Sequence, residues 1–73
     1  MSPKLPHLTS RDVVRLIEER GFVFDRQTGS HAVFRHPDGR RVTVPMHSAR
    51  TIGVGLLAQI LRGAEIDPDD IRK

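Results

Sequence analysis

The sequence predicts an α+β fold in which two helices pack on one face of a three-stranded antiparallel sheet. Apolar residues recur at helical spacing near both ends of the chain, while short alternating runs bounded by Gly and Pro occupy its middle. A chain of 73 residues without cysteine is expected to form one domain, residues 1–73, with no disulfide bonds. Within it, we expect residues 1–8 to form an irregular leader and residues 66–73 a short turn and tail.

The first helix is predicted over residues 10–20. Thr9 and Asp12 have the spacing of a capping box, in which each side chain accepts a backbone N–H at the start of a helix. Apolar residues follow at helical spacing from Val13, and Gly21 provides the left-handed residue that often ends a helix.

Three strands are predicted between the helices. The first begins at Phe22 and is broken at Thr28–Gly29, the second covers residues 30–36, and the third covers residues 41–44. Pro37-Asp38-Gly39 is a strong turn signal between the second and third strands. Because both connections are short, the strands are expected to form an antiparallel meander.

The alternation of side chains along a strand predicts which residues of the second strand share a face. His31, Val33 and Arg35 are expected on one face, opposite Ala32 and Phe34. Since the two helices cover only the face of Ala32 and Phe34, we expect the His31 face to be open, with Val33 partly covered.

The second helix is expected after a lead-in at Ser48–Thr51, with a wide apolar stripe running from Ile52 to Leu61. Asp67 and Pro68 have the pattern of a cap and first residue of one last helical turn. The predicted core consists of Val13, Leu16, Ile17, Phe22, Phe24, Ala32, Phe34, Val42, Val44, Ile52, Leu56, Leu57, Ile60 and Leu61.

The second helix also contains Gly53-Val-Gly55-Leu-Leu-Ala58, which matches a relaxed dinucleotide-binding fingerprint. No βαβ unit surrounds it, so the match does not indicate a nucleotide site. We expect instead that these glycines allow the helix to lie close to the sheet.

Basic residues concentrate in the middle of the chain. Between Arg26 and Arg50 there are five arginines and one acidic residue, whereas the tail from Glu65 to Asp70 carries four acidic residues. Arginine pairs with phosphate through two parallel hydrogen bonds, so this segment suits a polyanion, although a solvated surface without a ligand explains the charge equally well. No signal peptide or membrane-spanning stretch is visible, and we expect a cytoplasmic protein with no membrane partner.

Few side chains could carry chemistry near neutral pH. His31 and His36 are five residues apart and would point to opposite faces of a strand, so no metal site is expected. Ser30 likewise faces away from His31, which argues against a nucleophilic serine.

His31 is the candidate for acid–base chemistry. A histidine ordinarily titrates near neutral pH, and neighbouring arginines could hold an RNA phosphodiester while the ribose 2′-OH attacks it, without metal or cofactor. The alternative is a surface histidine without a role. The candidates for contact with phosphate are Lys4, Arg26, Arg35, Arg40 and Arg41.

The sequence resembles the HicA-type toxins of bacterial type II toxin–antitoxin modules over about residues 8–71. The resemblance rests on an ordered set of short motifs: Gly21-Phe22, Arg26-Gln-x-Gly29-Ser30-His31, Pro37-Asp-Gly39-Arg40-Arg41-Val-Thr-Val-Pro45-x-His47 and Ile52-x-x-Gly55-x-Leu57-x-x-Ile60-Leu61-Arg62.

This resemblance implies a fold like that of double-stranded-RNA-binding domains and an endoribonuclease that cleaves mRNA and thereby inhibits translation and growth. The catalytic residue that it implies is His31, with Gly29 and Ser30 setting the backbone geometry. A HicB-type antitoxin would cover the active site, and operator DNA would be bound only through that antitoxin. His47 also matches a family position, where we expect a structural role.

Two departures from the family pattern concern the second helix. Gly55-Leu56-Leu57 replaces a frequent Gly-Thr-Leu, and Glu65 stands where a Gly is usual, so that Gly63 could move the end of the helix. Two other classes of function stay open at this point. One is a non-catalytic RNA-binding module of the same fold, in which His31 would be dispensable and binding would fall steeply with salt. The other is a domain that binds only an acidic protein partner.

Overall fold

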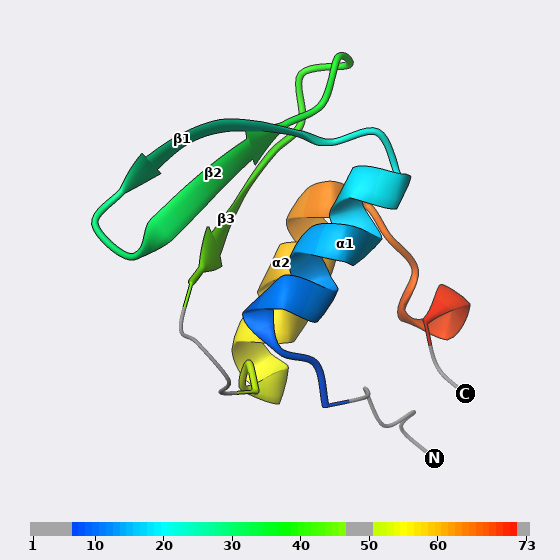
Figure 1. Ribbon diagram of the computed structural model, residues 1–73. Helices are drawn as coiled ribbons and strands as arrows, with labels where there is room; N and C mark the ends of the chain where they lie inside the picture. Colours follow the sequence, from blue (N-terminus) through cyan, green and yellow to red (C-terminus); the bar gives the residue numbers. More distant parts are fainter. Residues whose placement is uncertain (1–6, 47–50, 72–73) are drawn as a thin grey trace.

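The computed structural model describes residues 7–46 and 51–71, and its elements follow the predicted order (Figure 1). The α+β fold class is therefore confirmed. The elements are α1 (Ser10–Glu19), β1 (Val23–Thr28), β2 (His31–Arg35), β3 (Arg41–Pro45), α2 (Val54–Ala64) and a 3-10 turn, η1 (Pro68–Asp70).

The three strands form one antiparallel sheet in the order β1-β2-β3, and both helices lie against the same face of it (Figure 1). Both α1 and α2 contact β3. The core between these layers contains the fully buried side chains of Val13, Ile17, Val44, Leu57 and Leu61. The opposite face of the sheet carries no helix (Figure 1).

Two predicted core residues are on the surface instead. Phe24 is 54% exposed, because it lies on the edge strand β1, where its ring meets the edge of Phe34 at a centroid distance of 5.8 Å. Leu56 is 40% exposed and lines a shallow groove with Thr43 and Gln59 along the outer edge of β3. The prediction was therefore wrong at both positions, since the helices do not extend over the whole apolar pattern.

The register of β1 against β2 also departs from simple alternation. Phe24 is paired with Phe34 and Arg26 with Val33, so Asp25 is an extra residue that forms a bulge. The strand ends at Thr28, at the break that the sequence predicts at Thr28–Gly29.

Both helices end in the same hydrogen-bonding motif. After α1, the N–H of Phe22 donates to the carbonyl of Ile17 (3.1 Å) and Gly21 is left-handed with a φ of 95°. After α2, the N–H of Ile66 donates to the carbonyl of Leu61 (2.9 Å). These are Schellman motifs, in which an apolar residue beyond the helix packs against its last turn.

The left-handed position after α2 is filled by Glu65, with a φ of 57°. The helix thus runs through Gly63 and ends where the family pattern has its glycine. Gly63 serves packing instead, because a Cβ there would lie 3.4 Å from Val42 Cγ1. By contrast, a Cβ at Gly53 or Gly55 would meet nothing within 4 Å, so the expectation of close packing at these two glycines was wrong.

Candidate functional site

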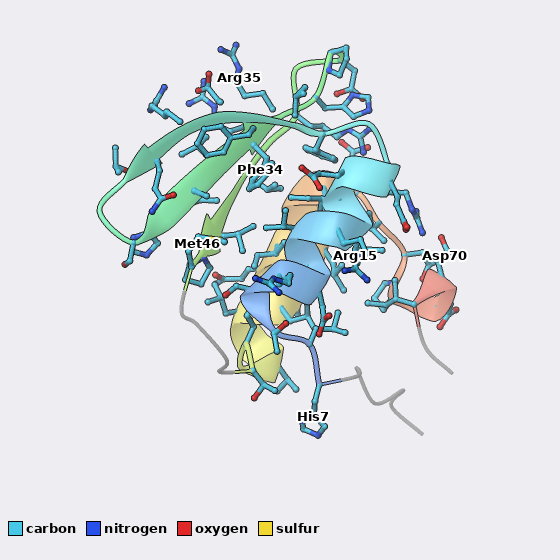
Figure 2. All side chains as sticks on the ribbon, in the orientation of Figure 1. His7, Arg15, Phe34, Arg35, Met46 and Asp70 are labelled. Atoms are coloured by element: carbon cyan, nitrogen blue, oxygen red, sulfur yellow. The ribbon has the colours of Figure 1, made fainter. Side chains whose placement is uncertain are left out.

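The open face, as we use the term, is the sheet face directed away from both helices. Figure 2 shows Arg35 projecting from this face while Phe34 points toward the helices. Strand alternation and cross-strand register place the following side chains on it: Val23, Arg26, Thr28, His31, Val33, Arg35, Arg41 and Thr43. The predicted division of β2 into an apolar face and an open face is confirmed for Ala32 and Phe34, which are buried.

His31 is the first residue of β2, immediately after the two-residue turn Gly29-Ser30. Gly29 has a φ of 59°, as the first central position of a type II′ hairpin turn requires, and its carbonyl accepts from Nε2 of Gln27 at 3.1 Å. The turn therefore fixes where His31 enters the sheet, while the Ser30 side chain is exposed.

The turn also places Thr28 directly opposite His31. Sequence reasoning missed Thr28 as a neighbour of the candidate histidine, although a two-residue hairpin turn at Gly29-Ser30 would have paired the two residues. His31 is exposed, and its ring makes no hydrogen bond or ion pair within the described part of the chain. Neither ring nitrogen of His31 is therefore used by the described part of the fold.

Three of the candidate arginines lie on the open face. Arg26 is paired through the register with Val33, and its Nη1 is 3.0 Å from Asp25 Oδ2. Arg35 and Arg41 stand directly opposite each other on β2 and β3. In the centre of the face, Val33 is only 7% exposed.

Arg40 is used differently. Its Nη1 donates to the carbonyl of Ala64 at the end of α2, its Nε is 2.8 Å from Asp38 Oδ2, and its guanidinium lies 5.2 Å from the centroid of the Phe22 ring. Arg40 therefore contacts residues at the ends of the helices, unlike Arg26, Arg35 and Arg41 on the open face. Lys4, also a candidate, and His47 lie outside the described residues.

His36 has a similar structural role at the end of α1. Its Nε2 donates to the carbonyl of Arg20 at 3.1 Å, and its Nδ1 accepts from the N–H of Asp38 at 3.1 Å. Its ring meets the edge of Phe22 at 5.1 Å. Gly21 makes room for this ring, because a Cβ at that position would lie 2.9 Å from His36 Nε2.

The remaining described histidine, His7, lies near the N-terminus and away from the sheet (Figure 2). Of the three described histidines, His31 is thus the one that stands on the open face. The order α-β-β-β-α is the one that the sequence resemblance implies, and His31 directly follows the Gly29-Ser30 turn.

Comparison with protein families identifies the family of the chain. The model of the HicA toxin of bacterial toxin–antitoxin systems matches residues 10–66. The chain belongs to the HicA toxin family. It is therefore a toxin of a toxin–antitoxin module, and membership implies an antitoxin as its partner. No curated protein matches the chain.

Two carboxylates of the toxin, Asp12 and Asp38, have pKa values that are lowered by their surroundings. Hydrogen bonds from the side chain and backbone of Arg40 hold the pKa of Asp38 below its ordinary value. Hydrogen bonds from the backbone and side chain of Thr9 lower the pKa of Asp12. The predicted capping box is present at the start of α1, because the N–H of Thr9 donates to Asp12 Oδ2 at 3.0 Å and the N–H of Asp12 donates to Thr9 Oγ1 at 3.2 Å. Both carboxylates thus stabilise the fold.

The described residues of the toxin contain neither a metal-binding cluster nor a membrane-spanning helix. Among residues 7–46 and 51–71, no group of three or more His, Asp or Glu side chains is arranged to hold a metal ion. No helix in the same ranges is long and apolar enough to cross a membrane.

Proposed function

We propose that this HicA toxin is an endoribonuclease that cleaves mRNA with His31 as general acid or base, needs no metal ion or cofactor, and thereby inhibits translation and growth. The observation that carries the proposal is the contrast between two histidines. His36 uses both ring nitrogens within the fold, whereas His31 is exposed, has no partner among residues 7–46 and 51–71, and lies on an open face that also holds three arginines.

The chemistry follows from the groups on this face. The ribose 2′ oxygen attacks the adjacent phosphorus, the bond from phosphorus to the 5′ oxygen breaks, and the products are a 2′,3′-cyclic phosphate and a 5′-OH. His31 either removes the 2′ proton or gives a proton to the leaving 5′ oxygen. Arg26 lies opposite Val33, closer to His31 along the sheet than Arg35 or Arg41, and stabilises the negative charge that grows on the phosphate oxygens in the transition state. DNA lacks the 2′-OH and is not a substrate.

Regulation follows from the same surface. An antitoxin of the HicB type would neutralise the toxin by covering the open face, so that RNA cannot reach His31. Operator DNA would then be bound through the antitoxin rather than through this chain, and the toxin would act in the cytoplasm where mRNA is found.

The test is cleavage of single-stranded RNA by purified toxin in the presence of EDTA. We expect the wild type to leave cyclic-phosphate and 5′-OH ends, the His31→Ala variant to be inactive, and the His7→Ala variant to remain active as the matched control. Equal cleavage by wild type and His31→Ala would contradict the assignment of His31. Binding of RNA by both proteins without cleavage by either would support the alternative, a non-catalytic RNA-binding module.

A further inference from the structure

We propose that Arg35 and Arg41 form a second phosphate site, separate from the bond that His31 cleaves, so that the toxin recognises a single strand several nucleotides long. The link of this site to cleavage rests on the proposed function, whereas its affinity for RNA can be measured independently.

The first argument is the arrangement of the two charges. Arg35 and Arg41 are direct cross-strand partners on β2 and β3. The N–H of the next residue, His36, donates to the carbonyl of Arg40 at 2.9 Å. The arginine pair is therefore one that does not exchange backbone hydrogen bonds, and its side chains lie closer together. Like charges in this position destabilise a sheet.

The second argument is the lack of a counter-charge. The ion pairs of the described residues use Arg20, Arg26 and Arg40 and leave Arg35 and Arg41 without a carboxylate. Other arginines without an ion pair in the described part, Arg11, Arg15 and Arg62, are on the helices. Nothing in the described fold explains why two arginines are placed directly opposite each other on neighbouring strands, whereas an anion bound by both would.

The spacing of the two opposed arginines indicates that the anion is a phosphate group. Opposed side chains on neighbouring strands have Cβ atoms roughly 4.5–5.5 Å apart, so both guanidinium groups can reach the same phosphate. Each offers paired N–H donors that match phosphate oxygens. The neighbouring Val23, 62% exposed and aligned with the same pair on β1, gives the site an apolar border.

The distance from His31 shows that this is a different phosphate from the one cleaved. His31 and Arg35 are four residues apart on one strand, about 13 Å at the usual rise, and strand side chains stand roughly perpendicular to the sheet. A single strand with a stacked rise of about 3.4 Å per nucleotide covers this separation in about four nucleotides, and an extended strand in fewer. One phosphodiester cannot therefore occupy both sites.

The experiment uses 2′-O-methyl RNA strands of two, four, six and eight nucleotides, which cannot be cleaved because the attacking oxygen is blocked. Their affinities are measured by competition against a fluorescent octamer. For the wild type, we expect affinity to rise sharply once the strand is long enough to span both sites. For the double variant Arg35→Gln/Arg41→Gln, octamer affinity falls roughly 10- to 100-fold, and the slope of log K against log salt falls by roughly 0.7 for each lost phosphate contact.

The matched control is the double variant Arg11→Gln/Arg15→Gln, which has the same net charge but is altered on α1, where Figure 2 shows Arg15 far from the open face. A loss of octamer affinity in this control equal to that of Arg35→Gln/Arg41→Gln would overturn the proposal, since the effect would then be general charge. An unchanged length dependence in Arg35→Gln/Arg41→Gln would overturn it as well.

The His31→Ala variant separates this proposal from the proposed function. It should cut no cleavable RNA but still bind the octamer, because Arg35 and Arg41 are unchanged. If the wild type binds with the expected length dependence but cuts no cleavable RNA, the arginine site stands and the ribonuclease assignment fails. If the wild type cuts RNA but shows no length dependence, the arginine site fails and the ribonuclease assignment stands.

Discussion

Replacing Glu65 by glycine should make this toxin more stable, although it removes every side-chain atom at that position. Glu65 is the left-handed residue after α2, with a φ of 57°. A side chain in this conformation costs roughly 1–2 kcal/mol relative to the right-handed region, and glycine avoids this cost. Glycine also increases the conformational entropy of the unfolded chain, which lowers the free energy of unfolding by roughly 0.4–1 kcal/mol. The net gain expected from Glu65→Gly is about 0.5–1 kcal/mol.

The assay is thermal unfolding followed by far-ultraviolet circular dichroism, because the chain has no Trp or Tyr for fluorescence. For a domain of this size the expected gain corresponds to a rise in Tm of roughly 2–8 °C. Glu65→Ala is the control, since it removes a carboxylate that is unfavourable near a helix C-terminus but keeps the Cβ. An equal rise in Glu65→Ala would attribute the effect to charge, and a fall in Tm for Glu65→Gly would refute the reasoning from backbone strain.

Four further predictions use the same measurement. Gly21→Ala should lower stability by about 1–3 kcal/mol, because it places a Cβ at positive φ and 2.9 Å from His36 Nε2. Gly55→Ala, in contrast, meets nothing within 4 Å and should raise stability by up to about 1 kcal/mol through helix propensity. Arg40→Met should cost about 2 kcal/mol, since the carbonyl at the end of α2 loses a charged donor; an unchanged Tm would show that this bond contributes nothing. Because the pKa of Asp38 is lowered in the folded state, its contribution is present above about pH 4 and is lost as the pH falls through the lowered value. The Asp38→Asn variant should therefore lose less stability than the wild type on acidification below about pH 4, and an identical acid profile would contradict this.

The parts of the fold that were predicted correctly depend on local signals. The start of α1 follows from Thr9 and Asp12, whose hydrogen bonds connect residues three apart, and its end follows from Gly21. The exposure of Phe24 could not be read from the sequence, because alternation shows which face a side chain occupies and not how far the helices extend over it. The end of α2 at Glu65 could not be predicted from the sequence either, since Glu65 adopts a left-handed backbone conformation that residues with a side chain disfavour.

The candidate site also contains some features that the sequence predicts and others that only the structure shows. Alternation within one strand was enough to place His31 and Arg35 on the open face. The opposition of Arg35 and Arg41 needed the register between two strands, which depends on contacts beyond the hairpin itself. The role of Arg40 depends on a carbonyl 24 residues away in the sequence, so no local pattern could distinguish it from its neighbour Arg41.

The different roles of Arg40 and Arg41 link the fold to the proposed site. His36 and Arg40 close the turn between β2 and β3, and each donates to a backbone carbonyl at the C-terminal end of a helix, α1 for His36 and α2 for Arg40. Helix C-termini carry partial negative charge and favour donors of this kind. These two bonds attach one end of the hairpin to both helices and thereby hold the register in which Arg35 and Arg41 face each other. A slip of the register by one residue would move every side chain of the strand to the other face of the sheet. His36 and Arg40 therefore stabilise the register in which the adjacent residues Arg35 and Arg41 can bind phosphate.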